Sequence, residues 1–186
     1  MKIIPHTKRI LLLAVFLIAA HLGMAQKYLS RENHVSFFSS APLEDIEAHS
    51  YKSTSVFDTE DGRIVFSIHI KTFEFEKSLM QEHFNENYLE SGKYPKAKFV
   101  GEVTGFNPES RDEQQVEATG TIEIHGVSRE INTQGTMRFH DEGVSLIATF
   151  PLTVADFDIK IPKVVARNIA EIVEVKLDFN YKPYDR

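Results

Sequence analysis

The feature that most constrains the fold is an alternation of apolar and polar residues with period two, which recurs along much of the chain. Successive side chains of a β-strand point to opposite faces, so the pattern predicts strands with one apolar and one polar face. The clearest examples are the segments 63–71, 115–125, 131–140 and 173–182. In the last of these, charged or amide side chains alternate with Val173, Val175, Leu177, Phe179 and Tyr181.

Shorter stretches of similar character extend this pattern and are separated by turn signals. They predict further strands at 35–39, 46–57, 98–106 and 144–154. Turns are expected at Asp61-Gly62, Asn107-Pro108 and Asp141-Glu142-Gly143. We therefore expect a mainly β fold, an antiparallel β-barrel of about eight strands with one inserted α-helix.

The inserted helix is predicted over residues 78–91, where the alternation stops. Ser78 to Gln81 fits a capping box. The residues that then fall near one stripe of the helix are Leu79, Met80, His83, Phe84 and Tyr88. Phe73 and Phe75 have the opposite parity to the strand before them, which predicts a β-bulge near Lys71-Thr72.

The first 25 residues are typical of a cleavable secretory signal. Lys2, Lys8 and Arg9 precede the apolar run Ile10–Ala20, which is shorter than the ~20 residues of a membrane-spanning helix. Gly23 and Ala25 suit a cut before Gln26. We thus expect a signal peptide at 1–25, one domain at 26–186 and a periplasmic or secreted protein, with an uncleaved N-terminal anchor as the alternative.

Composition narrows the classes of partner. The absence of cysteine excludes a lipid-modified Cys anchor, structural disulfides and thiolate chemistry. The net charge of −6, which falls further once the three signal-peptide cations are removed, argues against nucleic acid as a partner. No second long apolar run follows residue 25, so we expect no stable membrane insertion. Whether two chains form a homodimer is left open.

The apolar strand faces are rich in aliphatic residues and phenylalanine, and they include glycine and alanine at several positions. The chain has 14 Phe and no Trp. The glycines either let strands coil sharply to close the barrel or also leave room for a ligand, and both readings stay open. An interior with few hydrogen-bonding groups suits a hydrocarbon. The predicted ligand contacts are Phe66, Ile68, Phe73, Phe84, Phe99, Val103, Ile122, Met137, Phe139 and Phe150.

A further candidate contact lies in the segment Pro162–Ala170, which has an irregular pattern. We expect it to form a loop at the mouth of the barrel, where Arg167 meets the polar head of a ligand.

Two stretches of the chain resemble the YceI-like family. They are Tyr94-Pro95-Lys96-Ala97-Lys98-Phe99 and Gly120-Thr121-Ile122-Glu123-Ile124-His125-Gly126-Val127-Ser128, and the helix before them, with His83, Phe84 and Tyr88-Leu89, is also similar. The opening Asn33–Pro42 follows the family only in part, and Ser128 stands where Thr is more usual. The resemblance implies a lipocalin-like barrel, usually periplasmic, that binds polyisoprenoids or other amphiphilic lipids in its tunnel.

Chemical motifs are few. His69, His125 and His140 lie on polar strand faces, but their spacing does not favour a metal site. Gly126 is expected to allow a turn between strands, with His125 facing water. Asp156 and Asp158 lack the surroundings of a glycosidase pair. We therefore predict no catalytic residue, no metal and no cofactor beyond the bound lipid.

The sequence thus favours an exported carrier that sequesters a polyisoprenoid or similar amphiphilic lipid. One alternative is an integral outer-membrane β-barrel, whose alternating strands would turn their apolar face to lipid. Another is an enzyme that acts on a bound lipid, which would require a polar residue deep in the tunnel.

Overall fold

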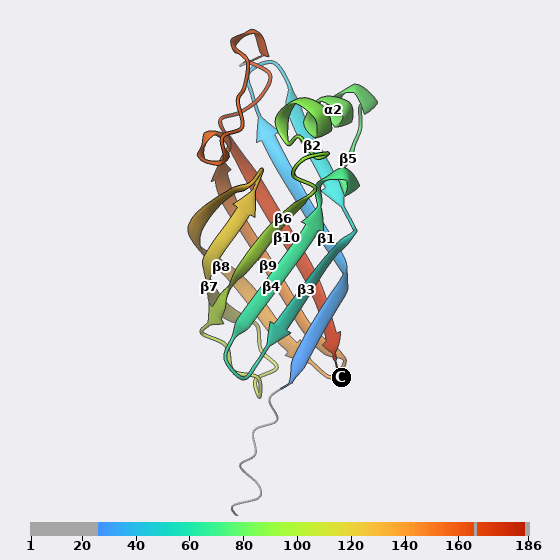
Figure 1. Ribbon diagram of the computed structural model, residues 1–186. Coiled ribbons are helices and arrows are strands. Elements are labelled where there is room, and N and C mark those ends of the chain that lie inside the picture. Colours follow the sequence, from blue (N-terminus) through green and yellow to red (C-terminus); the bar gives the residue numbers. More distant parts are fainter. Residues whose placement is uncertain (1–25, 166, 185–186) are drawn as a thin grey trace, which may run out of the picture.

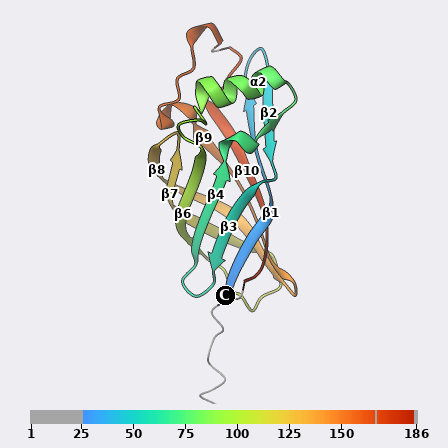
Figure 2. The same ribbon diagram turned by 45° about the vertical axis from the view of Figure 1, so that its right-hand side comes forward.

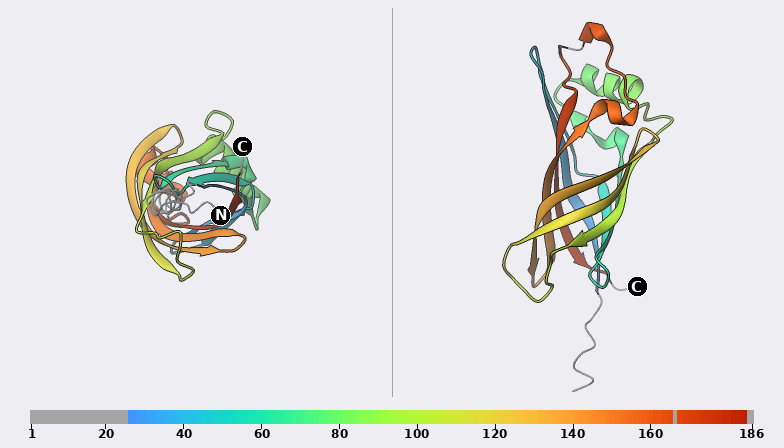
Figure 3. Two further views of the ribbon diagram at one scale, coloured as in Figure 1. Left: turned by 90° about the horizontal axis from the view of Figure 1, so that it is seen from below. Right: turned by 90° about the vertical axis from the view of Figure 1, so that its left-hand side faces the viewer.

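The computed structural model describes residues 26–165 and 167–184, whose strands form one antiparallel sheet that closes into a barrel (Figure 1). The ring runs β1-β10-β9-β8-β7-β6-β4-β3, and β3 pairs again with β1. Its strands are β1 (Lys27–Ser40), β3 (Ser53–Asp58), β4 (Arg63–His69), β6 (Lys96–Thr104), β7 (Gln114–Ile124), β8 (Val127–His140), β9 (Gly143–Thr153) and β10 (Ile172–Pro183). Seen from below, they surround a common axis (Figure 3). The predicted antiparallel barrel is confirmed.

The alternation of residue types places one set of side chains inside this ring. On β6, for example, Ala97 and Val103 are buried, whereas Lys98 and Glu102 are exposed. Burial of the apolar set removes it from water, which is the main favourable term in folding. The predicted inward and outward faces are therefore found on the strand that carries one of the two family-like stretches.

The predicted strand 46–57 is two strands in the structure. β2 (Asp45–Ser50) pairs with the upper part of β1, and β3 pairs with its lower part. Between them, the Ser50 hydroxyl accepts a hydrogen bond from the backbone N–H of Lys52 (3.3 Å) and contacts the Thr72 hydroxyl (2.7 Å). A serine side chain that satisfies the backbone in this way competes with the strand ladder, so the strand is interrupted at Tyr51 and Lys52.

The bulge predicted near Lys71-Thr72 is instead a 3₁₀ turn, η1 (Ile70–Thr72). It buries Ile70 and Phe73 and leads into the short strand β5 (Glu74–Phe75), which pairs with β2. The change of parity was correctly placed, but a helical turn produces it.

The predicted helix exists, and it lies across the upper end of the barrel (Figure 2). It consists of α2 (Ser78–His83) and a π-helical turn, η2 (Phe84–Tyr88), so it ends earlier than the expected residue 91. The prediction of a capping box is wrong, because Lys77 is the N-cap and makes no side-chain hydrogen bond to the helix. The Gln81 side chain accepts the backbone N–H of Phe75 (3.3 Å) and so ties the helix to β5.

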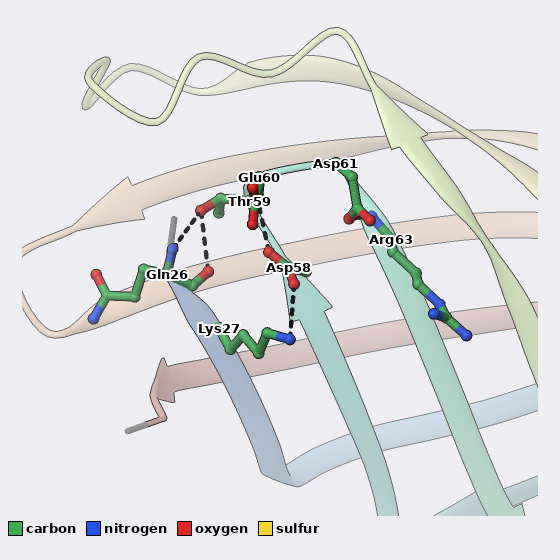
Figure 4. A network of polar contacts seen from close by, with 7 residues as sticks. All are labelled: Gln26, Lys27, Asp58, Thr59, Glu60, Asp61 and Arg63. Atoms are coloured by element: carbon green, nitrogen blue, oxygen red, sulfur yellow. Dashed lines mark hydrogen bonds and ion pairs between the residues drawn. The ribbon is translucent and has the colours of Figure 1, made fainter. Parts of the chain in front are cut away.

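The lower end of the barrel is fastened by a polar network around the start of β1 (Figure 4). Thr59 and Gln26 exchange backbone and hydroxyl hydrogen bonds of 3.0–3.2 Å. Next to them, Asp58 accepts the backbone N–H of Glu60 (3.0 Å) and pairs with Lys27 (3.2 Å). These contacts join β1 to the turn between β3 and β4. The predicted signal peptide, residues 1–25, lies outside the described residues.

Candidate ligand-binding cavity

The upper part of the barrel encloses a cavity of about 420 Å³ with almost entirely apolar walls. All barrel strands except β3 contribute side chains to it. Its upper boundary is formed by β2, β5, α2, η2 and the segment 154–169, which includes the short 3₁₀ turns η3 (Val154–Phe157) and η4 (Lys163–Val165). The inward faces of the strands therefore enclose a space that their own side chains leave unfilled.

Four phenylalanine rings hold the helix over this cavity. Phe84 of η2 lies 5.4 Å from Phe37, 5.7 Å from Phe73 and 5.0 Å from Phe75, measured between ring centroids. The Phe37 pair is stacked, and the other two are edge-to-face and tilted. Such pairs are favourable for aromatic rings at this separation. The helix is thus attached to β1 and β5 by apolar contacts that themselves line the cavity.

Below the cavity the barrel is filled by a second aromatic group, here called the plug: Tyr28, Phe57, Phe106, Phe139 and Tyr181. The ring of Phe57 lies 5.3 Å from Phe106 and 6.1 Å from Tyr181, and Phe139 contacts Phe106 at 6.1 Å. Phe57, Phe139 and Tyr181 are almost completely buried. The barrel is therefore closed at this end by its own side chains.

A buried polar contact lies within the plug. The Tyr181 hydroxyl lies 2.7 Å from the Ser55 hydroxyl, which also donates to the carbonyl of Val65 (3.1 Å). Burial raises the pKa of Tyr181 well above its usual range, while the hydrogen bond to Ser55 opposes the shift. The phenol therefore stays neutral, and its polar atom is satisfied in an apolar region.

Most of the predicted ligand contacts lie together around the cavity. Eight of the residues named from the sequence line it: Phe66, Ile68, Phe73, Phe84, Phe99, Val103, Ile122 and Phe150. The prediction missed Phe37, which lies on the same inward face of β1 as the buried Val35. It also missed Val173, Val175 and Leu177 of β10, although their inward parity is plain in the sequence.

The structure places three predicted contacts elsewhere. Met137 and Phe139 are buried but do not line the cavity, because their positions near the end of β8 put them at the level of the plug. Arg167 lies, as expected, in a loop at the mouth, but its side chain is exposed and outside the lining. Its backbone carbonyl accepts the N–H of Leu43 (3.0 Å).

The inward glycines Gly101, Gly120 and Gly135 all allow close approach of neighbouring strands, and Gly135 also lines the cavity. Gly101 and Gly120 are opposite each other on β6 and β7, and a Cβ on Gly120 would lie 2.5 Å from the Cα of Gly101. A Cβ on Gly101 would lie 2.5 Å from the Phe99 ring, so both glycines allow close approach and do not enlarge the cavity. Gly135 lines the cavity, together with the small residues Ala97, Ala118 and Ala148, but a Cβ on it would also lie 2.6 Å from the Ile147 carbonyl oxygen.

Polar cavity-lining residues are found mainly towards the mouth, where Glu44 connects two segments. Its carboxylate accepts a hydrogen bond from Lys77 Nζ (2.6 Å), and this bond lowers the pKa of Glu44 below its usual range, with a smaller contribution from Asn168. On the same side, the Ser39 hydroxyl accepts the backbone N–H of Ala170 (3.0 Å). These contacts join the turn between β1 and β2 to the helix and to the segment after η4.

His125 does not face water as predicted, although the turn at Gly126 is confirmed. The His125 side chain is 10% exposed, and its Nε2 lies 2.8 Å from a Glu90 carboxylate oxygen. Its Nδ1 lies 3.0 Å from the carbonyl of Phe157, and its ring is 4.6 Å from Tyr94. The φ angles of 53° at His125 and 74° at Gly126 form the tight turn that aims the imidazole at these partners. His125 thus joins the two family-like stretches.

Two other kinds of feature are absent from the part of the chain that the structure describes. No group of three or more His, Cys, Asp or Glu side chains there is arranged to hold a metal ion. In residues 26–165 and 167–184, no helix combines the length and the apolar character needed to cross a bilayer.

Comparison with known proteins agrees with this geometry. Residues 30–181 match the model of the YceI-like domain. A polyisoprenoid-binding domain from Saccharophagus degradans, implicated in plant cell wall breakdown, has the same fold, with a TM-score of 0.72 and 15% identity over 86% of this chain and 99% of that one. No curated protein sequence matches the chain significantly.

Two other solved structures share the fold. Burkholderia cenocepacia BcnA superposes with a TM-score of 0.67 and 17% identity, over 79% of this chain and 94% of that one. The YceI protein of Campylobacter jejuni gives a TM-score of 0.56 and 15% identity, over 75% and 85%. With the family match over most of its length, the chain belongs to the YceI-like family.

Proposed function

We propose that this protein is an exported carrier that binds a polyisoprenoid or similar amphiphilic lipid, with the hydrocarbon chain inside the barrel and the polar end at the mouth. The observation that carries the proposal is a mainly apolar cavity with the ionisable side chains of Glu44 and His83, and the amide of Asn168, towards its mouth. A volume of about 420 Å³ is within the range of small-molecule sites.

The ligand class rests on the walls and on the family. Phe66, Phe99 and Phe150 supply apolar rings, and neighbouring aliphatic side chains complete a surface with few hydrogen-bonding groups. Such a surface selects ligands by length and apolar character. One protein of the same fold is described as polyisoprenoid binding, which supports the same class of ligand here.

The lining favours binding over catalysis. An enzyme acting on a bound lipid would need an acid, base or nucleophile within reach of the reacting atoms. The deeper walls, around Ile64, Val103 and Val116, are mainly aliphatic and aromatic. Among the described residues there, Thr133 and Gln134 are polar, but neither is an acid or a base. We accordingly propose no catalytic residue.

The direction of the strand faces also favours a ligand inside the barrel over lipid around it. Outward-facing positions of β6 and β7 carry charged residues such as Lys98, Glu102 and Glu117, which are exposed. A barrel embedded in lipid has the opposite arrangement, with an apolar band outside.

Extraction of the purified protein provides the test. The protein is isolated without detergent and extracted with organic solvent, and the extract is analysed by mass spectrometry. A lipid with a long apolar chain is expected in a fixed ratio to protein, and adding polyprenols of increasing length to stripped protein should raise Tm. Each added methylene is worth about 0.8 kcal/mol until the cavity is full, or roughly fourfold in Kd.

A protein that contains no such lipid and is not stabilised by any polyprenol would contradict the proposal. Export is tested separately, by releasing the periplasm with osmotic shock and measuring the mass of the released chain. A chain that begins at Gln26 would support cleavage of residues 1–25, whereas retention of the full-length chain in the membrane fraction would support the uncleaved anchor.

A further inference from the structure

One side of the cavity mouth carries a segment that is both basic and apolar, although the chain as a whole is acidic. The segment from Lys160 to Ala170, here called the basic lip, contains Lys160, Lys163 and Arg167 and no acidic residue, whereas the whole chain has a net charge of −6. All three cations are exposed. The segment rises above the barrel beyond the end of β9 (Figure 1).

The basic lip carries an apolar residue at its outermost turn. Val164 in η4 is 90% exposed, while Val165 beside it and Ile161 before it line the cavity. Leu43 lies in the turn between β1 and β2 and is 60% exposed, and its backbone N–H donates a hydrogen bond to the Arg167 carbonyl. Apolar surface therefore continues from the outside of the lip to the inside of the cavity.

The opposite side of the mouth has a different charge. α2 and η2 carry Glu82 and Glu86, both exposed, and Glu76 precedes them. Leu79 on α2 is 59% exposed, almost the same as Leu43, but it lies on this acidic side. The lip thus contains three cations and no carboxylate, between the exposed Asp158 and Glu171, whereas α2 and η2 contain no Lys or Arg. Lys77, which precedes α2, is paired with Glu44.

We propose that the basic lip, together with Leu43, docks on an anionic phospholipid bilayer. Lys160, Lys163 and Arg167 attract the negative surface, Val164 and Leu43 enter the interfacial region, and the acidic helix is held away from it. This orientation presents the mouth of the cavity to the membrane. As a route for cargo it rests on the proposed lipid-binding function, but the docking itself can be measured without any cargo.

The test is flotation of the purified protein with vesicles of phosphatidylcholine, with and without phosphatidylglycerol. We expect binding only to the anionic vesicles, and we expect it to weaken as salt is raised. Loss of each cation should weaken vesicle binding about fivefold, so the double variant Lys163→Glu with Arg167→Glu should bind at least roughly twenty-five-fold more weakly. The matched control, Arg63→Glu with Arg111→Glu, makes the same charge change at the closed end and should bind like the unmodified protein.

Exposed apolar residues provide a second matched pair. Leu43→Ser should weaken vesicle binding, whereas Leu79→Ser should not, although the two side chains are equally exposed. Thermal unfolding of each variant serves as the control that it is folded. Equal loss in the two leucine variants, or equal binding to neutral and anionic vesicles, would overturn the proposal.

The outcome for docking is separable from the outcome for lipid binding. A protein that takes up polyprenol delivered in detergent but does not float with anionic vesicles retains the proposed function and loses the docking surface. A protein that floats through its lip but takes up no polyprenol shows the reverse.

Discussion

The two ends of the barrel are built from the same alternating strands, yet one is solid and the other is hollow. At the closed end the plug brings rings from β1, β3, β8, β10 and the loop after β6 into mutual contact. At the open end the inward phenylalanines lie around an unfilled space of about 420 Å³. An inward apolar face is therefore necessary for a cavity but does not by itself create one.

Small residues account for part of the difference. Ala118, Gly135 and Ala148 lie on the consecutive strands β7, β8 and β9 and all line the cavity, with Gly135 opposite Ala148 in the register. β3 contributes nothing to the lining, and its inward residue Phe57 belongs to the plug. Hollow and solid regions thus follow from where small side chains on adjacent strands come together.

The largest expected effect is on stability when a plug ring is removed. Phe139→Ala should lower the free energy of unfolding by about 3–5 kcal/mol, because the surrounding rings cannot collapse into the space. Phe150→Ala, at the cavity wall, should lose roughly half of this or less, since that ring already borders a void. Urea unfolding of the two variants measures the contrast, and equal losses would show that the cavity is not empty in the protein.

Adding a larger side chain should affect stability differently at the two ends of the barrel. Ala118→Phe should change stability by less than about 1 kcal/mol and should lower affinity for polyprenol by at least about tenfold, because the new ring occupies the ligand's place. Val144→Phe, at a fully buried position that does not line the cavity, should cost about 1–3 kcal/mol through overpacking. Unfolding curves and polyprenol titration distinguish the two, and unchanged affinity in Ala118→Phe would contradict the proposed site.

A smaller effect is expected from the buried polar contact of the plug. Ser55→Ala removes the partner of the Tyr181 hydroxyl and should cost about 1–2 kcal/mol, because a buried donor is left unsatisfied. The control is Ser128→Ala at an exposed position, for which we expect less than about 0.5 kcal/mol. Thermal unfolding at neutral pH measures both variants. If Ser55→Ala leaves the stability unchanged, water replaces the hydroxyl.

The smallest effect concerns the network at the lower end. The backbone N–H of Glu60, followed by Lys27, lowers the pKa of Asp58 in the folded protein. A depressed folded pKa stabilises the protein above the unfolded value of ~3.9, and this contribution is lost as pH falls through the folded pKa. Asp58→Asn should therefore cost less than about 1 kcal/mol at neutral pH. The difference from the unmodified protein should shrink below about pH 4, and a difference independent of pH would contradict this assignment.

Much of the fold was predictable because it depends on local patterns. The parity of residues 63–71 and 173–182 identifies strands and their inward faces without any knowledge of neighbours. The exceptions arise where a side chain forms a hydrogen bond that the alternation of residue types does not reveal. Ser50 interrupts one strand, and Gln81 bonds to Phe75 instead of completing a capping box. His125 is directed to Glu90 and Phe157, which lie more than thirty residues away on either side.

The sequence by itself determined the strands and their apolar faces, since alternation along each strand needs only the order of residues, and its family-like stretches indicated a barrel. It also identified most of the cavity lining, because large inward residues are recognised by parity. Only the tertiary structure decided that Phe139 belongs to the plug and Phe99 to the cavity wall. The physical reason is that a void depends on which side chains from different strands reach the same level, and that level is set by strand register and barrel closure.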